Sequence, residues 1–159
     1  MEWRSGSDYP YPSSPDVSIR MRANRGRNTG PERVVRSLLH GSGLRYRVHF
    51  AARVDQGRPI SIDVAFPAIK LAVFIDGCFW HGCNKHRTVP VANASYWGPK
   101  LSRNVERDKI TTVRLEADGW HVRRYWEHDD PTVVAADIAV VVTTLRGNAG
   151  RTHITVSAT

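Results

Sequence analysis

The stretch Ile60-Ser-Ile-Asp-Val-Ala-Phe66, continued after Pro67-Ala-Ile by Lys70-Leu-Ala-Val-Phe-Ile75, decides how this sequence folds. Both runs are short, apolar and rich in β-branched or aromatic residues, which predicts two strands joined as a hairpin by the Pro-Ala turn. Asp63 interrupts the first run, where a carboxylate is costly unless it is paired or binds a metal. Asp76 ends the second strand, so the hairpin is expected to bring two acids close together.

Helix signals precede this hairpin. Thr29 is a suitable N-cap, Pro31 and Glu32 fit the first turn, and Gly41 or Gly43 ends the helix. The other expected elements are strands over 44–50 and 120–126 and helices over 96–118 and 131–145, the last with a strand as its alternative. The order helix, three strands, helix, strand is that of a small α/β or mixed-sheet domain.

The length and charge of the chain limit the number of domains and the kinds of partner that it can have. With 159 residues it fits one domain, expected over 20–146 between a disordered leader (1–19) and a flexible tail (147–159). The net charge is +8, and only four of the 23 basic residues are lysines. Arginine-rich surfaces favour nucleic acid, although cytosolic proteins of high-GC genomes are also arginine-rich. With no apolar run of about 20 residues and no signal-peptide pattern, we expect a cytoplasmic protein without membrane contact.

A basic arm precedes the first helix. Between Arg20 and Arg36 six arginines face the single acid Glu32. Such an arm is either solvated or follows the phosphates of DNA, and Arg22 and Arg25 are the contacts expected in the second case.

Three acids and one histidine are the candidate catalytic groups. Asp63, Asp76 and Glu32, once gathered by the fold, would bind Mg²⁺, which prefers oxygen ligands. The alternative for Asp63 is a buried carboxylate that hydrogen-bonds turn backbone. His81 follows the second hairpin strand, where an imidazole can take a proton from an attacking water or hydrogen-bond a phosphate.

The two cysteines, Cys78 and Cys83, lie five residues apart with His86 nearby. In a reducing compartment this spacing indicates zinc before it indicates a disulfide, and a closed tetrahedral site needs a fourth ligand. His128 is our choice for that ligand, with His81 and His121 as alternatives.

Aromatic side chains accompany these ligands. Phe79 and Trp80 are adjacent on a tight loop, so at least one of them should project and be able to enter a base step. Trp97 can join them or belong to the core. Lys100 and Asn104 lie on the same helix face as Trp97, and both can hydrogen-bond base edges.

Together these residues resemble the very short patch repair endonucleases, the T:G mismatch nicking enzymes of bacteria. The likeness runs from about Met21 to Glu127. It is carried by Met21-Arg22, Thr29-Gly-Pro-Glu32, Gly57-Arg-Pro, Asp63, Gly-Cys-Phe-Trp-His81, Tyr96-Trp97, Asn104-Val-Glu-Arg-Asp108, Gly119-Trp and Trp126-Glu127. The resemblance implies a restriction-endonuclease-like core of order αβββαβ, of the PD-(D/E)xK superfamily, with a structural zinc site.

The resemblance also implies roles for individual residues. Asp63 would bind Mg²⁺, His81 would be the catalytic histidine, and Glu32 would support the metal and its water. The implied DNA contacts are the major-groove wedge Phe79, Trp80 and Trp97, the minor-groove residue Met21, and Lys100 and Asn104 at the mismatched pair. Asp108 would lie near the active site. The zinc ligands would be Cys78, Cys83, His86 and His128.

Three positions depart from better-known members of that family. His128 replaces a cysteine, Asp76 stands where a histidine can occur, and Ile75 stands where a threonine can occur. Ile75 would serve the metal through its backbone carbonyl, and Asp76 would add a direct or water-mediated ligand.

The implied function is a Mg²⁺-dependent nick 5′ of the thymine at a T:G mismatch in double-stranded DNA. The implied setting is the bacterial cytoplasm and nucleoid, with a monomeric enzyme that meets mismatch-repair proteins and a cytosine-5 methyltransferase system. The alternatives are a restriction-type nuclease that cuts a specific or modified sequence, and a zinc-bearing DNA-binding module without catalysis.

Overall fold

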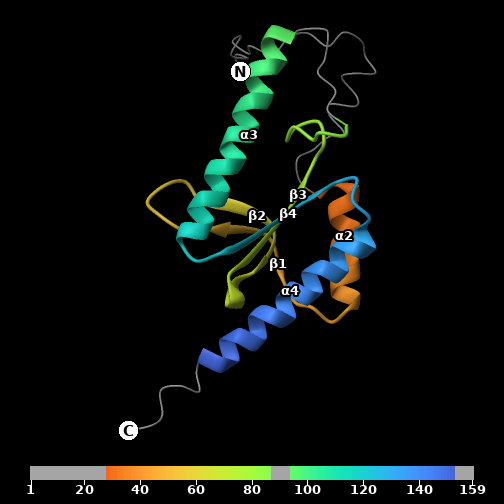
Figure 1. Ribbon diagram of the computed structural model, residues 1–159, viewed down its shortest axis with the longest axis vertical. Coiled ribbons are helices and arrows are strands. Elements are labelled where there is room, and N and C mark those ends of the chain that lie inside the picture. The colour runs from red at the N-terminus through yellow and green to blue at the C-terminus, as the bar shows by residue number, and fades with distance from the viewer. Residues whose placement is uncertain (1–27, 87–93, 153–159) are drawn as a thin grey trace, which may run out of the picture.

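A computed structural model of the chain describes residues 28–86 and 94–152 (Figure 1). The expected leader (1–19) and the candidate DNA contacts Met21, Arg22 and Arg25 lie outside these residues. Within them, no helix is both long enough and apolar enough to cross a membrane.

The order of the elements confirms the sequence prediction. The elements are α2 (Gly30–Gly41), β1 (Arg47–Ala52), β2 (Ile60–Phe66), a short 3-10 turn (Pro67–Ile69), β3 (Leu71–Asp76), α3 (Ala94–Ala117), β4 (His121–Trp126) and α4 (Pro131–Thr152). The last element is a helix, as expected, and not the alternative strand.

Two of the expected boundaries are displaced by three residues or more. The first strand begins at Arg47 rather than at residue 44, because Leu44 N still donates to Leu39 O and thereby completes the end of α2. The last helix continues through residues 147–152, where the sequence predicts a flexible tail. Each further helical residue adds a hydrogen bond to an existing helix, and no proline interrupts this segment.

The four strands form one sheet in the order β1-β2-β3-β4. The pairs β1–β2 and β2–β3 are antiparallel, which confirms the hairpin, whereas β4 lies parallel to β3 after the crossover through α3. Helices α2 and α4 cover one face, and α3 covers the other (Figure 1). The sheet therefore separates two apolar clusters, one on each of its faces.

Strand β2 changes face at Asp63. Ile62 packs on the side of α3, whereas Val64 packs on the side of α2 and α4, although residues two apart in a regular strand share a face. The opposing residue of β1 is His49, because Val48↔Val64 and Phe50↔Ile62 pair on either side of it. His49 has a left-handed backbone, with φ 48°, and its buried Nδ1 has no hydrogen-bond partner among the described residues. At this change of face, opposite the left-handed backbone of His49, the side chain of Asp63 lies in neither apolar cluster.

Candidate active site and metal centre

Asp63 is held between β2 and β3. The two strands pair from Phe66↔Leu71 to Val64↔Val73, and beyond that point the amide of Ile75 donates to Asp63 Oδ2 at 3.0 Å. Burial raises the pKa of Asp63 to about 6, and the nearby charges of Glu32 and Asp76 act in the same direction. A cation beside this carboxylate would relieve both effects, which is the electrostatic reason to regard Asp63 as a metal ligand.

Glu32 reaches the same region from the first turn of α2. It is 3% exposed, and it accepts hydrogen bonds from Asn28 N at 2.9 Å and from the Thr29 hydroxyl at 3.1 Å. The hydroxyl of Thr29 also caps the helix by accepting from Glu32 N. Glu32 thus stabilises the start of α2, and its catalytic role stays a prediction.

Asp76, at the end of β3, pairs with an arginine that sequence reasoning missed. Arg124 of β4 donates through Nε to Asp76 Oδ2 and through Nη2 to Asp76 Oδ1, both at 2.8 Å. This fork-to-fork geometry satisfies a carboxylate that is only 7% exposed. Arg124 had a recognisable signal, because it shares its side of β4 with Val122, which packs against the cluster on the α3 face.

His81 is oriented by an acid from α3. Its Nδ1 lies 2.5 Å from Asp108 Oδ2 and 3.6 Å from Asp76 Oδ1. Burial raises the pKa of Asp108, but the hydrogen bond and charge of His81 and the charge of Arg124 outweigh it and hold that pKa below its usual value. With Nδ1 engaged by Asp108, Nε2 is the ring nitrogen left for chemistry.

These groups share one cleft of about 740 Å³. Its lining includes the predicted residues Glu32, Asp63, Ile75, Asp76, Phe79, Trp80, His81, Asn104 and Asp108. It also includes Arg58, Arg107, Arg124 and Glu127, which sequence reasoning did not assign to the site. Buried carboxylates beside arginines suit a substrate that is itself anionic and is bridged to the protein by a cation.

An aromatic cluster lies at the cleft. Phe79, Trp80 and Trp97 contact one another with ring centroids 4.9 to 5.9 Å apart. Phe79 and Trp80 are half-buried and line the cleft, whereas Trp97 is 5% exposed and does not line it. Two rings are therefore placed to meet a bound molecule, and Trp97 supports them from behind.

Lys100 and Asn104 follow Trp97 on α3. Lys100 Nζ lies 5.1 to 5.8 Å from the ring centroids of Tyr96, Trp97 and Trp80, and it donates to the Tyr96 hydroxyl at 3.0 Å. Asn104 Nδ2 donates to Trp80 O at 3.4 Å. Both side chains thus hold the aromatic cluster in this structure, and their contacts to a mismatched pair stay predictions.

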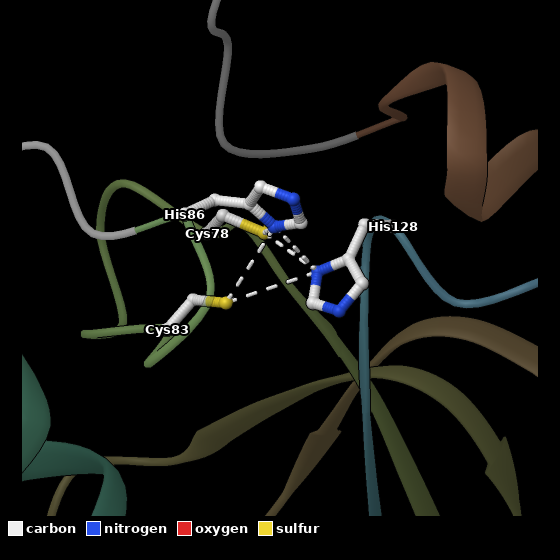
Figure 2. A group of neighbouring side chains, drawn as sticks. All are labelled: Cys78, Cys83, His86 and His128. Carbon is white, nitrogen blue, oxygen red and sulfur yellow. Dashed lines mark hydrogen bonds between the residues drawn. The ribbon is translucent and has the colours of Figure 1, made fainter.

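The four predicted zinc ligands converge on one point. Figure 2 shows Cys78, Cys83 and His86 on the loop after β3 and His128 after β4, with their side chains directed toward one another. Their ligand atoms all lie within 4.8 Å of one another. His81, an alternative fourth ligand, instead faces Asp108, and among the described residues no group of potential ligands contains His121.

The spacing of these atoms fits a tetrahedral ion. Bonds of about 2.0 Å to nitrogen and 2.3 Å to sulfur place two nitrogens about 3.3 Å apart and a sulfur about 3.5 Å from a nitrogen. The two Nδ1 atoms, of His86 and His128, are 3.3 Å apart, and three of the four sulfur–nitrogen distances are 3.7 to 3.9 Å. Only the distance of 2.9 Å between Cys78 Sγ and His128 Nδ1 is shorter than such an edge. The cluster can hold a metal ion, and its two sulfurs and two nitrogens suit Zn²⁺.

Glu127 joins the group of cysteines and histidines to the cleft. Its side chain accepts from Cys78 N at 2.7 Å, and its amide donates to Asp76 O at 2.9 Å. The loop that carries Phe79, Trp80 and His81 is therefore tied at its start to both β3 and the turn after β4.

A mixed sheet that carries a carboxylate-lined cleft, a carboxylate-oriented histidine and basic residues suits a hydrolase of the nuclease class. The particular family is shown by comparison: the model of the family "DNA mismatch endonuclease Vsr" matches residues 8–87. The chain belongs to this family of DNA endonucleases.

Three relatives illustrate this membership. Type II nicking enzyme V.NaeI of Lentzea aerocolonigenes is 46% identical over 137 residues, which are 86% of this chain and 81% of that protein. Type II nicking enzyme V.XorIIP of Xanthomonas oryzae pv. oryzae is 41% identical over 67% of this chain and 76% of that protein. DNA mismatch endonuclease Vsr of Escherichia coli strain K12 is 38% identical over 69% of this chain and 68% of that protein.

The raised pKa of Asp63 predicts a stability effect. Between its ordinary value of 3.8 and about 6, the folded protein binds more protons than the unfolded one, so stability falls as pH rises through this window. At about pH 7, without added divalent cation, the ionised carboxylate costs on the order of 2–3 kcal/mol. Asp63→Asn, which can still accept from Ile75 N, is therefore expected to raise the melting temperature by several degrees.

Thermal unfolding followed by circular dichroism at pH 5 and pH 7.5 measures this effect, and the gain should be larger at the higher pH. Asp118→Asn is the matched control, since Asp118 pairs with Lys70 at the surface. A lower melting temperature for Asp63→Asn at pH 7.5 would mean that the buried charge is compensated without a cation.

Proposed function

We propose that the protein is a Mg²⁺-dependent endonuclease that nicks one strand of duplex DNA 5′ of the thymine at a T:G mismatch. The observation that carries the proposal is the single cleft in which Asp63 and the Asp108-oriented His81 lie beside Phe79 and Trp80. The order α2, three strands, α3, β4 supports a restriction-endonuclease-like core of the PD-(D/E)xK superfamily.

The carboxylate end of the cleft would bind the catalytic cation. Asp63 and the carbonyl of Ile75 would hold Mg²⁺ directly, Asp76 would act through water because Arg124 occupies its oxygens, and Glu32 would support them. When bound, Mg²⁺ lowers the pKa of an attacking water and neutralises charge on the phosphate.

His81 would move the proton. Because Asp108 engages Nδ1, Nε2 is the atom to take a proton from the attacking water, as in other histidine–carboxylate pairs. Arg58 and Arg107 line the cleft and would attract the DNA phosphates.

The aromatic pair would select the mismatch. Phe79 and Trp80 can stack on bases that part from the helix, and a mismatched pair unstacks at lower cost than a matched one. Trp97 would support the rings from behind, and Lys100 and Asn104 would fix them and contact the exposed base edges. Met21, Arg22 and Arg25 would add contacts from the N-terminal arm.

The zinc cluster would keep this loop in shape, with Cys78, Cys83, His86 and His128 as ligands. Burial and the neighbouring Cys83 thiol raise the pKa of Cys78, so metal binding should release a proton and strengthen as pH rises. The proposed setting is a cytoplasmic, nucleoid-associated monomer that works with mismatch-repair proteins behind a cytosine-5 methyltransferase.

A pair of duplexes of identical sequence, one with T:G and one with T:A at the same position, tests the function. With Mg²⁺ the T:G duplex should be cut once, 5′ of the thymine, and the T:A duplex should stay intact. A panel of all mismatches in several flanking sequences then defines the selectivity.

Two outcomes would contradict the proposal. Equal cutting of both duplexes would favour a restriction-type nuclease that reads a specific or modified sequence. Binding without cutting, with any divalent cation, would favour a zinc-bearing DNA-binding module.

A further inference from the structure

Arg124 occupies a central position in the cleft. It projects from β4, whose parallel register places it opposite Phe74 of β3, and its guanidinium lies 4.7 Å from the Phe74 ring centroid. The guanidinium binds both oxygens of Asp76, and its Nη2 lies 3.4 Å from Asp108 Oδ1. One arginine thus bridges the end of β3 to α3.

The two carboxylates bridged by Arg124 are the two that flank His81 Nδ1. The ring nitrogen is 2.5 Å from Asp108 Oδ2 and 3.6 Å from Asp76 Oδ1. Asp76 has its oxygens committed to the fork of Arg124, so Asp108 is the partner that engages the ring. Arg124 thus contacts both acids that flank the histidine, and it binds Asp76 through both oxygens but Asp108 through one.

We propose that Arg124 is a positioning residue that directs His81 to Asp108 by keeping Asp76 in an ion pair. The inference rests on the proposed function, in which Nε2 of His81 serves the reaction. Without Arg124, Asp76 would be a buried carboxylate without a cation beside it. An unpaired buried charge is strongly destabilising, so Asp76 would gain free energy by binding another hydrogen-bond donor. His81 Nδ1 is close enough to donate to Asp76, and the ring would then turn away from Asp108.

The first variant to test is Arg124→Met, which keeps an unbranched apolar stem but removes the charge and the fork. In single-turnover assays with saturating enzyme, the rate of nicking should fall by about 100-fold, a loss within the usual contribution of a positioned proton-transfer group. The Kd for the same duplex should change by less than about threefold, because the guanidinium is committed to Asp76 and Asp108. Arg124→Lys keeps the charge but not the two-pronged hydrogen bonding, and its nicking rate should lie between those of Arg124→Met and the wild type.

The decisive comparison is made in the background of Asp76→Asn. With the competing carboxylate removed, adding Arg124→Met should lower the nicking rate by less than about threefold relative to Asp76→Asn alone. The effects of the two substitutions on the rate are then strongly non-additive. Removing both members of the pair also avoids a lone buried charge, which keeps the comparison usable should Arg124→Met alone fail to fold. Arg123→Met, at an exposed position of the same strand, is the matched control and should nick as the wild type does.

An NMR measurement reports on the hydrogen bond between His81 and Asp108 in the absence of substrate. The Nδ1–H proton of His81, bound to Asp108, should give a downfield NMR resonance that is altered in Arg124→Met and returns in the double variant. A wild type that cuts no duplex would refute the proposed function, whereas this resonance would still report on Arg124.

Two results would overturn the inference. A rate loss of about 100-fold for Arg124→Met that persists in the Asp76→Asn background would show that Arg124 acts other than through Asp76. An unchanged rate with weakened duplex binding would make Arg124 a phosphate contact.

Discussion

Asp63→Asn is expected to slow the single-turnover nicking of a T:G duplex by about 1,000-fold or more, which corresponds to roughly 4 kcal/mol of transition-state stabilisation. Asparagine keeps the shape of the side chain and the hydrogen bond from Ile75 N, but it lacks the charge that would hold Mg²⁺. The substitution therefore separates the chemistry of this position from its place in the sheet.

The measurement compares the rate at saturating enzyme with the Kd of the same duplex. Binding should change by less than about threefold, because the arginines and aromatic rings that would meet the DNA are untouched. Asp118→Asn, at the Lys70 end of the sheet, should nick normally. An active Asp63→Asn enzyme would remove Asp63 from the metal site and leave it as the buried, backbone-bonded carboxylate of the alternative interpretation.

Cys83→Ser is expected to abolish zinc binding and to reduce nicking by at least about 1,000-fold. A serine hydroxyl is a poor ligand for Zn²⁺, and structural sites of this kind need all four donors. Phe79, Trp80 and His81 lie on the chain between two of the ligands, Cys78 and Cys83. Loss of the metal should therefore displace the proposed wedge and the proposed base together.

Zinc content by atomic emission should fall from about one per chain to nearly none, while far-ultraviolet circular dichroism should retain the helices and sheet. That part of the fold should survive because the two apolar clusters on the sheet contain neither cysteine. Asn84→Ser, on the neighbouring exposed residue, is the control that should keep both zinc and activity. A Cys83→Ser protein with one zinc per chain and normal nicking would refute the proposed ligand set.

The elements near the hairpin could be predicted from sequence because their signals are local. The strand Ile60–Phe66 and the cap at Thr29 agree with the structure, since apolar runs and capping residues act over a few neighbouring residues. The boundaries of two elements differ from the prediction by three residues or more. The hydrogen bond from Leu44 N delays β1, and the last helix continues to Thr152.

The group of cysteines and histidines could also be proposed from sequence as a metal site, for a chemical reason. Thiols and imidazoles at close spacing have few common structural uses besides metal binding, and His128 was chosen because it follows a strand expected in the same sheet. The parallel pairing of β4 with β3 places His128 beside the start of the loop that carries Cys78, and its role as a zinc ligand stays a prediction.

The sequence by itself determined the strands, the buried acid Asp63 and the set of cysteines and histidines, because each depends on residue type and short spacing. Only the tertiary structure decided which acids hold His81 and what neutralises Asp76. Arg124 lies 48 residues from Asp76, beyond the crossover helix α3, and the two meet through the parallel register of β3 and β4. A local pattern does not specify the register between distant strands, because that register is set by the packing of both faces of the sheet.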